Sequence, residues 1–174
     1  MITYAILAVL GLVMLIPNGL LVLWPPSTGH FWPWQVVTYA LVHVGWAHLL
    51  LNSIAFWQLG RWAEREFTRF DYVVLLIACT VGSATLHLLS GSLDPVAGIS
   101  GTIFGLLTVY AFHNPQAGVW WLLPPVRLSA RKMIVALAVV SLLTALTGWL
   151  PTIGHWAHLG GIITGYICYR VMER

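Results

Sequence analysis

At residues 96–105 the chain reads Val-Ala-Gly-Ile-Ser-Gly-Thr-Ile-Phe-Gly, which places a serine between two glycines at the start of an apolar run. A polar side chain is costly inside a membrane, so Ser100 is a candidate functional residue. The flanking glycines permit a tight turn and the close approach of another backbone. Ser100 is therefore a candidate nucleophile, but a serine at this place is also typical of a helix N-cap.

The composition of the chain excludes an ordinary water-soluble domain. Of its 174 residues 59% are hydrophobic and 7% are charged, whereas soluble domains have roughly a quarter of charged residues. The net charge is +3 and no basic stripe occurs, so nucleic acid is not an expected partner. We expect one all-α membrane domain over residues 1–174, with the lipid bilayer as its surroundings.

Six apolar segments are candidates for membrane-spanning helices, each of which ordinarily needs about 20 residues. They cover residues 2–23, 45–62, 71–90, 100–113, 131–149 and 155–172. The fourth is short, since its residues form roughly 21 Å of helix and the hydrocarbon core is about 30 Å thick. We therefore expect Ser100 at the bottom of a recess, which irregular backbone of residues 90–99 enters.

The charges predict the orientation of these segments. Every Lys and Arg falls on one side of a six-span arrangement: Arg61, Arg65, Arg69, Arg127, Arg131, Lys132, Arg170 and Arg174. The positive-inside rule makes that side cytoplasmic, together with both termini. The first loop, residues 24–42, is rich in Trp and lacks Lys and Arg, so we expect it at the outer membrane interface. The site of Ser100 would open to the same, extracytoplasmic side, and the absence of organelle signals suggests a prokaryotic plasma membrane.

A histidine near the outer end of the sixth segment is a candidate general base for Ser100. Two small-xxx-small pairs, which allow close helix packing in membranes, occur in the fourth and sixth segments: Gly101 with Gly105, and Gly161 with Gly165. A contact of these two segments would bring His158 to Ser100, and imidazole is the usual base at neutral pH. His155 is a rival three residues earlier, and an interfacial histidine without catalytic function is the simpler alternative.

His48 and Asn52 lie four residues apart and therefore on one face of the second segment. Two neutral donors at this spacing are candidates for an oxyanion hole, although hydrogen bonding between helices is an equally good interpretation. His43 lies off this face, so we expect a structural role for it. Asp94 is the only acid outside the expected cytoplasmic side, and it precedes a proline in a loop. The sequence therefore predicts a Ser–His dyad without an acid, and no motif indicates a metal or another cofactor.

Together these motifs resemble the rhomboid family of intramembrane serine proteases. The matching patterns are HxxxxHxxxN at residues 43–52, GxSG at 98–101 and AHxGGxxxG at 157–165, with Glu64 at the usual end of the second helix. The resemblance implies a six-helix fold and cleavage of single-span membrane proteins within or beside their transmembrane segment. It also implies the roles of the site residues: Ser100 as nucleophile, His158 as base, and His48, Asn52 and the Ser100 backbone N–H as oxyanion hole.

Two positions depart from the family pattern. Gln35 follows Trp34 where the family often has arginine, and Phe104 occupies a place that often holds tyrosine. A phenylalanine can still stack on the histidine. Two other functions are alternatives. One is a catalytically inactive rhomboid-like protein that binds membrane clients, against which the intact Ser100 and His158 argue. The other is a channel or transporter, for which the sequence lacks paired intramembrane charges and a detectable inverted repeat. The substrate and the oligomeric state do not follow from the sequence.

Overall fold

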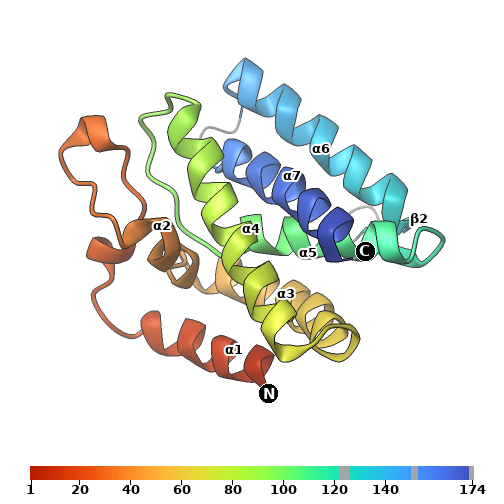
Figure 1. Cartoon of the computed structure of the whole chain (residues 1–174). Coiled ribbons are helices and arrows are strands. Elements are labelled where there is room, and N and C mark those ends of the chain that lie inside the picture. Colours follow the sequence, from red (N-terminus) through yellow and green to blue (C-terminus); the bar gives the residue numbers. More distant parts are fainter. Residues whose placement is uncertain (122–125, 150–152, 173–174) are drawn as a thin grey trace.

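The frame of the molecule is a set of six helices of 12 to 21 residues, seen in a computed structural model that describes residues 1–121, 126–149 and 153–172. The helices are α1 (Ile2–Val13), α3 (Trp46–Glu66), α4 (Arg69–Leu89), α5 (Ser100–His113), α6 (Ala130–Thr147) and α7 (His155–Met172). A long first loop with four short helical turns joins α1 to α3: η1 (Gly19–Leu21), η2 (Pro26–Thr28), α2 (Gln35–Thr38) and η3 (Tyr39–Leu41). Figure 1 shows this loop, in red and orange, at the opposite end of the molecule from the chain's C-terminus.

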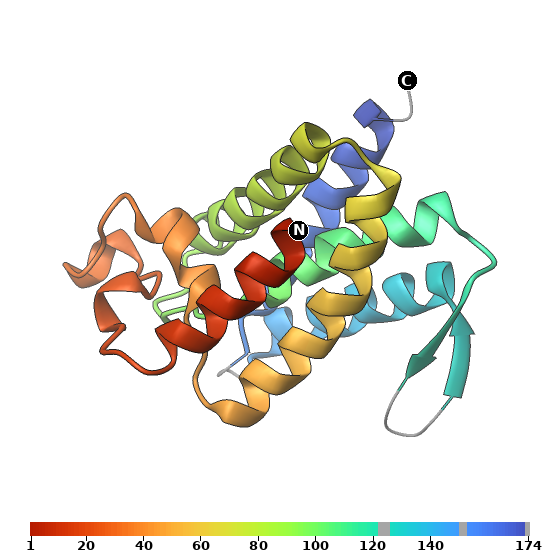
Figure 2. The same cartoon turned by 90° about the horizontal axis from the view of Figure 1, so that it is seen from below.

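Helix α5 is the centre of the bundle, since it packs against α3, α4, α6 and α7. Nine of its fourteen residues are buried, and the two views show it enclosed by the other helices (Figures 1 and 2). Its Leu106 and Val109 belong to a core that also contains fully buried side chains of α1, α3 and α4: Leu10, Phe56, Tyr72 and Leu75. The first residue of α5, Ser100, is therefore held by a helix that is anchored on all sides.

Helices α5 and α7 approach each other through glycines, as the sequence predicts. A Cβ atom added to Gly161 would overlap the carbonyl oxygen of Gly101, and one added to Gly165 would overlap that of Gly105. On the other side of α7, a Cβ on Gly160 would lie 2.8 Å from the Cα of Ser83 in α4. Real Cβ atoms do not tolerate such contacts, so α7 fits between α4 and α5 only because these positions lack side chains.

A polar network joins the start of α1, the end of α3 and the start of α4. The carboxylate of Glu64, in the last turns of α3, accepts hydrogen bonds from the backbone N–H of Ile2 and from the Thr3 hydroxyl, at 2.7 Å for the latter. The same hydroxyl lies 3.0 Å from the hydroxyl of Tyr72. A carboxylate at a helix N-terminus satisfies free N–H groups and complements the helix dipole. Glu64 therefore fixes the start of α1 against α3.

Two elements differ from what the sequence analysis expects. The first helix ends at Val13 rather than near residue 23, and the Asn18 side chain donates to the Val13 carbonyl at 3.1 Å. The cause is Pro17, which cannot continue a helix and disfavours helical backbone at the residue before it. A hairpin that was not expected joins α5 to α6 through β1 (Gly118–Trp121) and β2 (Val126–Ser129). Figure 2 shows it projecting from the helical bundle.

The other helices agree with the expected segments to within a few residues, and α5 and α7 have the expected bounds. Within the described ranges, α4 and α6 are each long and apolar enough to cross a membrane. A third such unit is formed by residues 35–41 with α3, bent by 98°. The number of six spans accordingly stays a prediction, as does the orientation. Arg174, one of the eight basic residues on which that orientation depends, lies outside the described residues.

Candidate active site

The loop before α5 places Ser100, and it is pinned to the first loop by backbone hydrogen bonds. Leu23 and Val96 exchange two such bonds, of 3.0 and 2.9 Å, and the N–H of Gly98 donates to the carbonyl of Tyr39 at 3.0 Å. Gly98 has a φ of 117°, a backbone conformation that favours glycine. This turn directs the chain into α5, which begins at Ser100.

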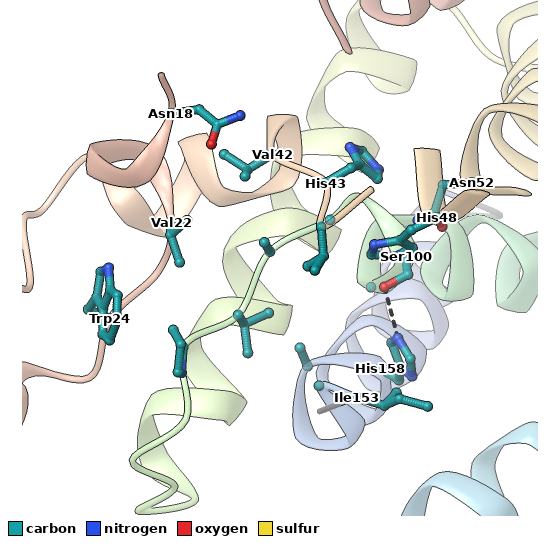
Figure 3. A pocket seen from close by; sticks show the side chains of 18 residues that line it. Asn18, Val22, Trp24, Val42, His43, His48, Asn52, Ser100, Ile153 and His158 are labelled. Carbon is teal, nitrogen blue, oxygen red and sulfur yellow. Dashed lines mark hydrogen bonds between the residues drawn. The ribbon is translucent and has the colours of Figure 1, made fainter. Parts of the chain in front are cut away.

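Ser100 and His158 are brought together by the contact of α5 with α7. The distance between Ser100 Oγ and His158 Nε2 is 2.8 Å, and Figure 3 shows the two side chains pointing toward each other. The N-cap position of α5 is Ile99, and no side chain caps the helix. The Ser100 hydroxyl is therefore engaged with the histidine and does not serve as a helix cap.

Two aromatic rings contact the ring of His158. Phe104, one turn along α5 from the serine, stacks on it with ring centroids 4.2 Å apart and an interplanar angle of 10°. Phe104 thus stacks on the histidine, as expected for a phenylalanine at this position. His155 is buried, with its ring edge-on to His158 at 6.2 Å. The 2.8 Å contact with the Ser100 hydroxyl is made by His158.

His48 and Asn52 of α3 line the other side of the same site. A Cβ on Gly98 would lie 2.9 Å from His48 Cε1 and 3.8 Å from Asn52 Nδ2, so both side chains lie against the loop that leads to Ser100. Asn52 is 8% exposed, and its Nδ2 has no hydrogen-bond partner within the described part of the chain. A buried amide donor without a partner is costly, and such a group is available to a ligand.

His43 packs against the ring of His48. It is buried, and its ring meets that of His48 edge-on with centroids 5.0 Å apart. Burial, with a smaller contribution from His48, lowers the pKa of His43 to about 4. The structural role expected for His43 stays a prediction.

A cavity of about 850 Å³ joins these residues to the first loop. Ser100, His158, His48 and Asn52 lie at one end, and Figure 3 shows Trp24 of the first loop at the other. Residues 95–98, which lead to Ser100, also line this cavity. The cavity is large enough for water and for several residues of an extended peptide beside the serine.

Gln35 organises the first loop in the place of the arginine that is often found there. It is 1% exposed, and its side chain makes four hydrogen bonds to backbone groups of the loop. The partners are the N–H groups of Trp24 and Trp32 and the carbonyls of Leu20 and His30. The amide can both donate and accept, so it joins both kinds of backbone group without a charge.

One further polar residue next to the site was missed by the sequence analysis. His87, in α4, is 2% exposed and contacts the loop that leads to Ser100. The signal that could have found it is a histidine inside an apolar segment, which is a costly placement in a membrane. Within the described ranges, no group of three or more His, Cys, Asp or Glu side chains is arranged to hold a metal ion.

The comparisons with known proteins agree on one family. The rhomboid domain family matches residues 30–173. A putative rhomboid protease of Bacillus subtilis, YdcA, is 28% identical in an alignment 187 positions long, gaps included, which covers 98% of this chain and 88% of that protein. The rhomboid protease GluP of the same organism is 29% identical (76% of this chain, 25% of GluP). The rhomboid protease GlpG of Klebsiella pneumoniae is 26% identical (82% of this chain, 50% of GlpG). The chain thus spans a quarter of GluP and half of GlpG.

Proposed function

This chain belongs to the rhomboid family, and from that premise we propose that it is an intramembrane serine endopeptidase. Its substrates are single-span membrane proteins, cleaved within or next to their transmembrane segment. Family membership and its long apolar helices make the chain an integral membrane protein. The relatives named as proteases support the reaction class, while the dyad and the substrate class are our inference.

The observation that carries the proposal is the 2.8 Å contact of Ser100 Oγ with His158 Nε2 at the end of a cavity. A serine hydroxyl is a weak nucleophile, and an adjacent base activates it. With the ring proton on Nδ1, Nε2 accepts the hydroxyl proton while Oγ bonds to the carbonyl carbon of the scissile peptide. His158 then returns this proton to the leaving amine as the C–N bond breaks. A water molecule, deprotonated by the same nitrogen, then attacks the acyl carbon, and His158 returns this proton to Ser100 Oγ as the acyl–Oγ bond breaks.

The negative oxygen of the tetrahedral intermediate needs fixed donors. The Nδ2 of Asn52 lacks a partner within the described residues, and the N–H of Ser100 belongs to the first turn of α5, where the helix supplies no acceptor. His48, against Gly98, provides a third donor through its ring. Donors that are in place before the reaction stabilise charge without reorganisation. We assign these three groups to the oxyanion hole.

The membrane arrangement is part of the proposal. Six helices span a prokaryotic plasma membrane, with both termini in the cytoplasm and the cavity open to the extracytoplasmic side. Support comes from the basic residues, all of which lie on one side of such an arrangement. The short α5 then begins below the outer surface, where the cavity admits the water that hydrolysis requires.

The test is cleavage of a single-span substrate by the purified chain in liposomes. We expect the wild-type chain to cleave within or beside the transmembrane segment, and Ser100→Ala to be inactive with an unchanged melting temperature. Thr85→Val is the matched control, because Thr85 is an exposed residue whose hydroxyl donates to the Val81 carbonyl of its own helix. Equal cleavage by Ser100→Ala and wild type would refute the proposal. Stable binding of membrane proteins without cleavage would favour the inactive client-binding alternative.

A further inference from the structure

A buried histidine that the proposed mechanism does not use holds the loop in front of the nucleophile. His87 lies in the last turn of α4 and is 2% exposed. Its Nε2 is 2.9 Å from the backbone carbonyl oxygen of Asp94. A carbonyl only accepts hydrogen bonds, so Nε2 carries a proton and donates it. The other ring nitrogen, Nδ1, has no hydrogen-bond partner within the described residues.

The carbonyl that His87 holds is followed at once by the stretch that leads to Ser100. Asp94 precedes Pro95, and an X–Pro step favours extended backbone. Val96 is then paired with Leu23, and Gly98 with Tyr39. These two anchors come from the first loop, whereas His87 anchors the segment to α4. On its upstream side the bonds of the segment within the described ranges are local, such as that of Ser92 Oγ with the N–H of Asp94 at 3.2 Å.

A shift of this loop would alter the site at two points together. Gly98 lies against the His48 ring and the Asn52 amide, and Ser100 follows two residues later. A displacement of residues 94–98 would therefore move the serine relative to both its base and the proposed oxyanion donors. Misplacement of reacting groups by about 1 Å costs on the order of 100-fold in rate.

We propose that His87 is a positioning residue, which places Ser100 by donating a hydrogen bond to the Asp94 carbonyl. Its effect on reactivity rests on the proposed function, while its effect on the loop does not. The hydrogen bond, rather than the bulk of the ring, is the active feature. A side chain that keeps a donor at similar reach should therefore replace it, and an apolar side chain of similar size should not.

The experiment compares His87→Gln, His87→Leu and the control Thr85→Val, which removes a hydroxyl of α4 that donates to the Val81 carbonyl of the same helix. Three quantities are measured on the full chain in detergent: hydrogen exchange of peptides covering residues 90–99, the rate of acylation of Ser100 by a fluorophosphonate, and the melting temperature. If the leucine variant does not fold, His87→Met takes its place, because methionine fills irregular spaces.

In the leucine variant we expect faster exchange in residues 90–99 and an acylation rate lower by roughly 10- to 100-fold. The glutamine variant should be close to wild type in both, and Thr85→Val should match wild type. The inference is overturned if the leucine variant exchanges and reacts like wild type. It is also overturned if glutamine is as damaging as leucine, because then ring packing is the cause. If the wild-type chain is not acylated, the proposed function fails, and hydrogen exchange alone decides the role of His87.

Discussion

At the scale of single residues, the site depends on which polar groups are engaged and which are free. Ser100 is bonded to His158, and the ring of His158 is fixed by its stack on Phe104. Asn52, by contrast, keeps a buried amide nitrogen without a partner in the described part of the chain. This difference separates the proposed nucleophile and base, which must be in contact before the reaction, from a donor that gains its partner in the transition state.

The assignment of Asn52 predicts a specific kinetic effect. Asn52→Ala should lower kcat by on the order of 10²–10³ with little change in KM, because the lost hydrogen bond forms in the transition state. Steady-state kinetics with a transmembrane substrate measure both constants. Gln58→Ala, an exposed amide on the same helix, is the control and should be neutral. A rise in KM at unchanged kcat would instead place Asn52 in substrate binding.

The sequence predicts the residues with motifs, but it does not predict the hydrogen bonds that side chains make to backbone groups. A site can be proposed from the motifs that contain Ser100, His158, His48 and Asn52, because each of these residue types has a chemical role when it lies within an apolar segment. Gln35 and His87 have their importance from bonds to backbone groups. Those bonds depend on the path of two loops, and neither path can be derived from local sequence patterns.

At the scale of helices, the decisive contact is that of α5 with α7. The glycine pairs predict this contact from the sequence, and the structure confirms it at Gly101 with Gly161 and at Gly105 with Gly165. Ser100 and His158 are 58 residues apart in the sequence, and this contact brings their side chains within hydrogen-bond distance. The geometry of the site and the packing of the bundle therefore share one cause.

This coupling predicts the effect of a single methyl group. Gly161→Ala places a Cβ on the carbonyl oxygen of Gly101, so the helices must separate. We expect a loss of about 1–3 kcal/mol in the free energy of unfolding, together with slower fluorophosphonate labelling of Ser100. Gly11→Ala is the matched control, because nothing lies within 4 Å of its added Cβ. If both variants keep full stability and labelling, the α5–α7 contact does not position the dyad.

Two elements show where reasoning from periodicity fails. Apolar character continues from α1 through residues 14–23, and hydropathy alone therefore extends the helix, although Pro17 ends it. The sequence around the hairpin of β1 and β2 carries a strand signal instead, namely β-branched and aromatic residues beside Pro124 and Pro125. A search for apolar spans does not test for that signal. The bounds of α5 and α7 were predictable because Ser100, Asn114 and His155 mark clear changes from apolar to polar sequence.

At the scale of the whole molecule, the outer surface of the bundle is apolar. Large hydrophobic side chains are exposed on several helices, among them Leu12, Ile77, Val139, Leu143 and Ile167. Water-soluble monomers rarely expose contiguous apolar area of this extent, and a bilayer is the environment that such a surface fits. The cavity with Ser100 lies beside the start of α3, at His48 and Asn52, whereas the network of Glu64 lies at the end of the same helix.

The proposed orientation makes a prediction about access from the two sides. In a background of Cys79→Ala and Cys168→Ala, Ser27→Cys in the first loop should react with an impermeant maleimide added to intact bacterial cells. Gln116→Cys, between α5 and the hairpin, should react only after the membrane is permeabilised. Both positions are exposed in the structure, so a lack of labelling reflects the membrane rather than burial. The opposite pattern would show that the orientation derived from the basic residues is reversed.

The central claim is that Ser100 is a nucleophile activated by His158, and fluorophosphonate labelling with mass-spectrometric mapping of the adduct tests it most directly. The wild-type chain should carry one adduct, on Ser100. Ser100→Ala and His158→Ala should each lose it while they keep their fold, and His155→Ala should retain most of it. An adduct on another residue, or undiminished labelling of Ser100 in His158→Ala, would contradict the account.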